Sequence, residues 1–86
     1  MPELHELPGV GQLEIQMLNE QEIYNSFQML GIYLTMWVSP EQTQTTCDRY
    51  YSALREIGFP ESTAREVVKA VALRVAASGI LNMSGA

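Results

Sequence analysis

Two side chains in this sequence of 86 residues could support nucleophilic or acid–base chemistry near neutral pH, His5 and Cys47. A cysteine nucleophile is normally activated by an adjacent general base such as histidine. His5 is the single histidine, and it lies in an N-terminal segment that is rich in proline and glycine. We therefore expect His5 to be exposed without a catalytic role, and Cys47 to pack as a small apolar side chain.

The carboxylates and glycines are not spaced for metal or cofactor chemistry. A metal site needs clustered His, Cys or carboxylate ligands, and a phosphate-binding loop needs a glycine-rich turn. The sequence contains neither pattern. Glu20 with Glu22, and Glu61 with Glu66, are not spaced to face each other on a helix. The sequence thus predicts a protein that is not an enzyme and binds no cofactor or metal.

Charge is divided unevenly along the chain, whose net charge is −5. Residues 1–46 contain six glutamates and no lysine or arginine, so this half carries −6. The second half carries +1, because it holds all five basic residues and four acidic ones. An acidic half repels phosphate, so any contact with nucleic acid must come from the second half.

Length and composition favour one small domain in a reducing compartment. A hydrophobic content of 47% is ordinary for a folded protein, and a chain of this size forms only a marginal core. One cysteine cannot form an internal disulfide, which favours a cytoplasmic location. The first residues lack the regions of a signal peptide, and the central apolar stretch is shorter than the roughly 20 residues that a membrane span needs.

The uncharged residues 23–40 predict the first helix, over residues 20–38. Asn19 and Glu22 have the spacing of a capping box, and Leu18 and Ile23 that of the hydrophobic staple beside it. With about 100° of rotation per residue, one apolar stripe is expected to cover the core. That stripe consists of Ile23, Phe27, Leu30, Leu34 and Trp37.

A second apolar stripe lies on the other side of this helix and is expected to face a partner. It consists of Met29, Ile32, Tyr33 and Met36. Gly31, inside the helix, has two interpretations: a weak spot that costs roughly 1 kcal/mol, or a position where another helix approaches closely. Two apolar stripes on one helix require neighbours on both sides, which favours self-association or a protein partner.

A second helix is expected over residues 40–57. Ser39 can cap it and Pro40 suits its first position. Gly58 is expected to end it in a left-handed conformation, with Phe59 folded back onto Leu54.

A third helix is expected over residues 63–78, from a capping box at Thr63 and Glu66 to Gly79. Residues 1–18 are expected to form an irregular N-terminal arm, in which residues 13–17 alternate like a short strand but could equally extend a helix. Residues 19–81 would form the helical domain and residues 82–86 a frayed tail.

Residues 53–68, ALREIGFPESTAREVV, resemble the helix-turn-helix hairpin of bacterial and phage DNA-binding proteins. The sequence Ile57-Gly58-Phe59 matches the turn of that hairpin, and Ser62-Thr63-Ala64 matches the start of its second helix. The resemblance implies that helix 63–78 reads DNA through Ser62, Arg65 and Lys69. The sequence departs from the family where Leu54 replaces a small residue and where Glu61 and Glu66 add negative charge.

The expected fold is therefore all-α, a small three-helix bundle with a flexible N-terminal arm, completed by oligomerisation. The expected function is a non-catalytic interaction module that acts as a homo-oligomer, most simply a dimer, and presents an apolar surface to a protein partner. The alternative is a dimeric helix-turn-helix regulator, and no membrane partner is expected. The expected interface consists of Met29, Ile32, Tyr33, Met36, Trp37 and Leu73.

Overall fold

The computed structural model describes residues 4–79, and in this range every regular element is helical. The α-helices are α1 (Gln12–Glu20), α2 (Ser26–Met36), α3 (Thr43–Ile57) and α4 (Glu61–Ser78). Short 3₁₀ turns, η1 (Leu4–Glu6) and η2 (Pro40–Gln42), precede α1 and α3. The expected all-α bundle is confirmed, although four α-helices build the described part instead of three.

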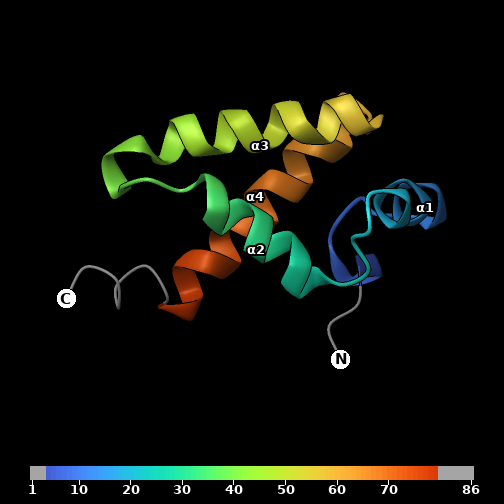
Figure 1. Cartoon of the computed structure of the whole chain (residues 1–86), viewed down its shortest axis with the longest axis horizontal. Coiled ribbons are helices and arrows are strands. Elements are labelled where there is room, and N and C mark those ends of the chain that lie inside the picture. The colour runs from blue at the N-terminus through green and yellow to red at the C-terminus, as the bar shows by residue number, and fades with distance from the viewer. Residues whose placement is uncertain (1–3, 80–86) are drawn as a thin grey trace.

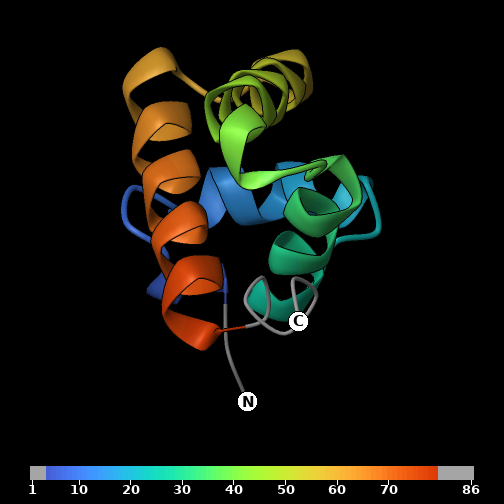
Figure 2. The same cartoon turned by 90° about the vertical axis from the view of Figure 1, so that its left-hand side faces the viewer.

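The helices α2, α3 and α4 pack against one another, and α1 joins them from the side (Figure 1). In Figure 2, α2 and α4 stand on either side, α3 crosses above them, and α1 lies behind. The core draws apolar side chains from all four α-helices, from η1 and from the connections. Its buried residues are Leu4, Leu7, Val10, Leu18, Ile23, Met29, Tyr33, Tyr50, Leu54, Phe59, Ala64, Val67, Val68, Val71 and Val75.

The N-terminal segment is packed, which corrects the expectation of a flexible arm. Leu4, Leu7 and Val10 are spaced three residues apart, and all three are buried in the core. Gly9 has a φ of 78°, and a Cβ atom at this position would lie 3.3 Å from the Thr63 side chain. The segment therefore lies directly on the first turns of α4, and its glycine permits this close approach.

The first predicted helix is wrong at its start. Residues 13–17 belong to α1, which ends at Glu20, and α2 begins only at Ser26. Asn25, not Asn19, caps α2, because its side chain accepts a hydrogen bond of 2.9 Å from the Gln28 backbone N–H. Between the two helices, Glu22 has a φ of 63° and turns the chain. A glutamate in the left-handed conformation is uncommon and has no characteristic sequence pattern. The interruption between α1 and α2 was therefore not predicted.

The connection between α3 and α4 has the geometry of a Schellman motif. Gly58 has a φ of 120°, the Phe59 N–H donates to the Leu54 carbonyl at 3.1 Å, and the Gly58 N–H donates to the Arg55 carbonyl at 3.1 Å. Leu54 and Phe59 are both buried. These two contacts turn the chain so that α4 packs back across α3.

Two differences concern the starts of these helices. Residues 40–42 form the η2 turn, and the α-helix proper starts at Thr43. The helix α4 starts at Glu61, two positions before the expected start at Thr63, and Gly79 with a φ of 76° follows its last residue. The predicted tail and the first three residues of the arm lie outside the described residues.

Candidate interaction surfaces

The second apolar stripe of α2, which was expected to face a partner, packs against the core of its own chain. Met29 and Tyr33, expected at an interface, are each only 1% exposed. The Tyr33 ring packs edge-on against Tyr50, with ring centroids 5.7 Å apart, and the Tyr50 hydroxyl donates to the Met29 carbonyl at 2.9 Å. Because these contacts lie within one chain, Met29 and Tyr33 belong to its core and are unavailable to a partner.

The other expected interface residues do not form one exposed surface with them. Ile32, Met36 and Trp37 are half-buried against the core. The Trp37 indole N–H is buried and has no hydrogen-bond partner within residues 4–79. Leu73 is 61% exposed, but it lies on α4. The structure thus separates the predicted interface into core, boundary and surface positions.

The exposed apolar surface of α2 includes Phe27, Leu30 and Leu34 from the stripe that was expected to cover the core, whereas Ile23 of that stripe is buried as expected. We call this surface the outer α2 face and define it by Tyr24, Phe27, Leu30, Leu34 and Val38. Tyr24, Phe27 and Val38 are 60%, 63% and 59% exposed, and the two leucines are half-buried. Both stripes are apolar, so the helical period alone could not tell which one faces inward.

Gly31 lies beside this outer α2 face and is not required by the packing of its own chain. A Cβ atom at Gly31 would have no neighbour within 4 Å. Glycine inside a helix costs about 0.5–1 kcal/mol relative to alanine. The space beside Gly31 is therefore open to close approach by another backbone, one of the two interpretations that the sequence allowed.

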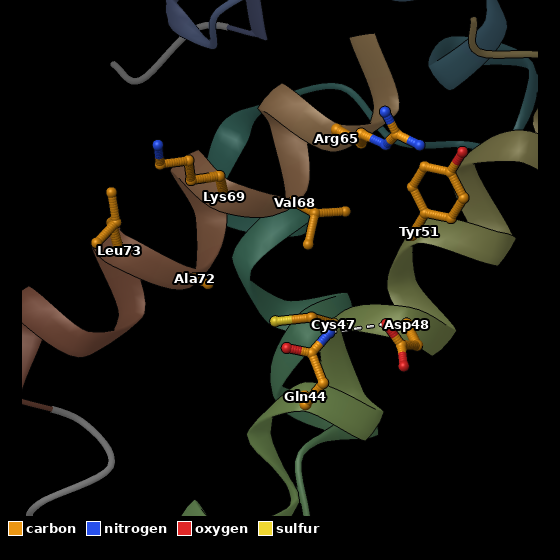
Figure 3. Close-up of a pocket in the computed structure, with 9 residues that line it drawn as sticks. All are labelled: Gln44, Cys47, Asp48, Tyr51, Arg65, Val68, Lys69, Ala72 and Leu73. Atoms are coloured by element: carbon orange, nitrogen blue, oxygen red, sulfur yellow. Dashed lines mark hydrogen bonds between the residues drawn. The ribbon is translucent and has the colours of Figure 1, made fainter. Parts of the chain in front are cut away.

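A groove lies between α3 and α4, and we call it the α3–α4 groove (Figure 3). Its volume is about 530 Å³, and no α2 residue lines it; the α2 ribbon lies behind it in Figure 3. Its lining combines apolar side chains with charges at the edges. The lining residues are Gln44, Cys47, Asp48, Tyr51, Arg65, Val68, Lys69, Ala72 and Leu73.

Polar contacts tie down some of the charges around the groove. The Gln44 side-chain amide donates to the Asp48 carboxylate at 2.9 Å, the bond drawn in Figure 3. Arg65 pairs with Glu61 at 2.8 Å, one turn earlier on α4. Lys69 points away from the groove floor in Figure 3 and is exposed. The edge formed by α4 is therefore the cationic one.

Cys47 is less buried than the sequence suggested, because it lines the α3–α4 groove and is half-buried. Its Sγ atom lies 3.8 Å from the Tyr33 hydroxyl. Burial, together with this hydrogen bond, raises the pKa of Tyr33 to about 12. Burial also raises the pKa of Tyr50. Both phenols are therefore un-ionised near neutral pH, and the pair contributes packing and hydrogen bonds between α2 and α3.

The residues proposed to contact DNA do lie on one side of α4. Ser62, Arg65 and Lys69 are all exposed and follow one another at helical spacing. The Arg65–Glu61 ion pair and the neighbouring Glu66 offset part of their positive charge. This helix surface therefore presents a short cationic strip with balancing carboxylates.

Residues 4–79 contain neither a candidate metal site nor a helix that could span a membrane. No group of three or more His, Cys, Asp or Glu side chains in residues 4–79 could hold a metal ion. No helix in this range is long and apolar enough to cross a membrane. His5 lies in η1 and is exposed.

No protein-family model matches this chain, and comparisons with curated proteins and with solved structures also find no match. The two surfaces, the outer α2 face and the α3–α4 groove, must therefore be interpreted from their own chemistry.

Proposed function

We propose that this protein is a non-catalytic helical interaction module of the cytoplasm that acts as a homo-oligomer through the outer α2 face. The observation that carries this proposal is the exposure of Phe27 on α2, a helix without a single charged residue, and of Tyr24 and Val38 beside its two ends. Large contiguous apolar patches on small proteins typically mark interaction sites. The open space beside Gly31 supports the same interpretation.

The energy available at this surface is large relative to the stability of so small a protein. Fully burying one large apolar side chain contributes roughly 1.5–3 kcal/mol. Several such side chains lie together on the outer α2 face, whereas a small domain is typically stable by only about 5–15 kcal/mol. Association through this face therefore adds stability that the isolated chain lacks.

The substitution Phe27→Glu tests this proposal. Phe27 contributes little to the core of its own chain, and a glutamate in the first turn of α2 interacts favourably with the helix dipole. The variant should keep the wild-type helical circular dichroism but should dissociate, as measured by sedimentation equilibrium. Ser52→Glu, at an exposed site of α3, adds the same charge elsewhere and should associate like the wild type.

Two results would contradict the proposal. One is a wild-type protein that remains monomeric up to about 100 μM, a concentration at which even weak specific contacts are populated. The other is a Phe27→Glu variant that associates as tightly as the wild type.

A helix-turn-helix regulator is the second candidate, and the shared exposed side of Ser62, Arg65 and Lys69 favours it. Its test is a fluorescence-anisotropy titration with random duplex DNA at low salt. Binding that weakens steeply as salt increases would support this candidate, because phosphate contacts release counterions. No binding at low salt would leave the protein-interaction module alone.

A further inference from the structure

An acidic, aromatic corner lies where α1 meets α2. It contains two exposed glutamates, Glu20 and Glu22, and two exposed aromatic side chains, Tyr24 and Phe27. We call these four residues the acidic corner. Negative charge beside exposed aromatic rings is a surface that a cationic, apolar groove complements.

The α3–α4 groove has that complementary chemistry. Arg65, which is paired with Glu61, and the exposed Lys69 lie one helical turn apart on its α4 edge. Leu73 continues the same edge with an exposed apolar side chain. Between the helices the lining is mostly apolar, with Val68 and Ala72 from α4, and the Asp48 carboxylate on the α3 side accepts a hydrogen bond from Gln44. An aromatic side chain placed here would contact apolar groups while a carboxylate beside it meets the cationic edge.

A two-fold contact between two outer α2 faces would instead bring like charges together. Glu22 precedes α2 and Glu41 follows it, and residues 1–46 contain no lysine or arginine. An antiparallel contact places Glu22 of one copy near Glu41 of the other, and a parallel contact places each glutamate near its counterpart. Such juxtaposed like charges oppose association.

We infer that the acidic corner of one copy docks into the α3–α4 groove of a second copy. The inference rests on the proposed self-association and names the surface that receives Phe27 and Tyr24. The uneven charge of the chain, −6 in residues 1–46 and +1 in the remainder, then acts as an attraction between copies.

The two surfaces cannot meet within one chain. In Figure 2 the connection between α1 and α2 lies on the opposite side of the molecule from α4. A contact between two different surfaces is heterologous, so it generates a closed ring or an open chain of copies. The protein therefore assembles head to tail, and its association weakens as salt screens the charges.

The test is a charge-swap experiment in sedimentation equilibrium at low salt, with full-length chains. Lys69→Glu reverses the cationic edge of the groove, and Glu22→Lys reverses the acidic corner; both side chains are exposed. Each variant alone should associate about 3- to 10-fold more weakly than the wild type, the effect of one reversed surface charge pair. Arg49→Glu, on the exposed side of α3 outside the groove, is the matched control and should associate like the wild type.

An equimolar mixture of Lys69→Glu and Glu22→Lys should restore association to within about 2-fold of the wild type, because each contact between the two variants again joins opposite charges. Leu73→Glu should also weaken self-association, since this exposed apolar side chain lies at the groove edge.

The alternative outcomes separate the inference from the proposed function. Association that Lys69→Glu leaves unchanged and Glu22→Lys strengthens would overturn the head-to-tail contact and indicate a two-fold contact through α2. A mixture no tighter than the single variants would also overturn it. A wild-type protein that does not associate at all would overturn both the inference and the proposed function.

Discussion

Two helix ends in this protein have the same hydrogen bonds but different residues at the turn. At the end of α3, the Phe59 N–H donates to the Leu54 carbonyl at 3.1 Å. At the end of α1, the Ile23 N–H donates to the Leu18 carbonyl at 2.9 Å. In both cases the two residues joined by this bond are buried apolar side chains. The ends of α1 and α3 are therefore two copies of one Schellman motif.

The difference lies in the left-handed residue. Gly58 has this position at the end of α3, with a φ of 120°, and Glu22 has it at the end of α1, with a φ of 63°. A left-handed conformation costs a residue with a side chain about 1–2 kcal/mol, whereas glycine adopts it freely. Other interactions must therefore offset the backbone strain at the end of α1.

The surroundings that hold Glu22 are visible in the structure. The Tyr24 N–H donates to the Gln28 side-chain carbonyl at 2.6 Å, and the Gln28 amide reaches the Glu22 carbonyl at 3.4 Å. These two hydrogen bonds link the connection between α1 and α2 to the first turn of α2. The two helix ends also adjoin, because a Cβ atom on Gly58 would lie 3.5 Å from the Met17 side chain.

The largest expected effects come from the apolar residue that follows each turn. Phe59→Ala should lower the free energy of unfolding by about 3–5 kcal/mol and Ile23→Ala by about 2–5 kcal/mol, because both remove buried side chains. Urea unfolding at a low, fixed protein concentration measures both changes without a contribution from association. An Ile23→Ala variant as stable as the wild type would show that the α1 end contributes nothing to the fold.

The sequence predicted the all-α class and located the end of α3 because glycine marks a left-handed turn. At the end of α1 the same apolar spacing was present in Leu18 and Ile23, but it was interpreted as the start of the next helix. Without a glycine, the spacing of five residues fits a helix start and a helix end equally well. The predicted helix over residues 20–38 therefore began before Ser26, the first residue of α2, and most of α1 was assigned to the N-terminal arm.

The candidate surfaces could be predicted less well than the elements. Phe27, Leu30 and Leu34 of the outer α2 face were identified as part of an apolar stripe, but that stripe was assigned to the core. Tyr24 and Val38 were not part of it. The choice between the two stripes depends on the edge-on contact of Tyr33 with Tyr50, which joins residues on different helices. The α3–α4 groove depends on how these helices cross, which no local pattern encodes.

An intermediate effect is expected at the glycine of the α3 end. Gly58→Ala should lower the free energy of unfolding by about 1–3 kcal/mol, because alanine is strained at this φ. Steric clash adds little, since the new Cβ atom would meet Met17 at an ordinary contact distance of 3.5 Å. The urea midpoint measures the change.

Gly31→Ala is the matched control for this variant. Gly31 lies inside α2 with open space around it, so alanine should raise stability by about 0.5–1 kcal/mol at that position. If Gly58→Ala left the midpoint unchanged, the left-handed turn would not stabilise the end of α3.

The smallest expected effect has the opposite sign and concerns the α1 end. Glu22→Gly should raise the free energy of unfolding by about 0.5–1 kcal/mol, because glycine relieves the left-handed strain but gains freedom in the unfolded chain. Glu22→Ala keeps the strain and should remain close to the wild type. Gln21→Gly, at a neighbouring residue with a φ of −96°, relieves no strain and should lower stability by a similar amount. A lower urea midpoint for Glu22→Gly, equal to that of Gln21→Gly, would mean that Glu22 is not strained and that the two helix ends differ in sequence alone.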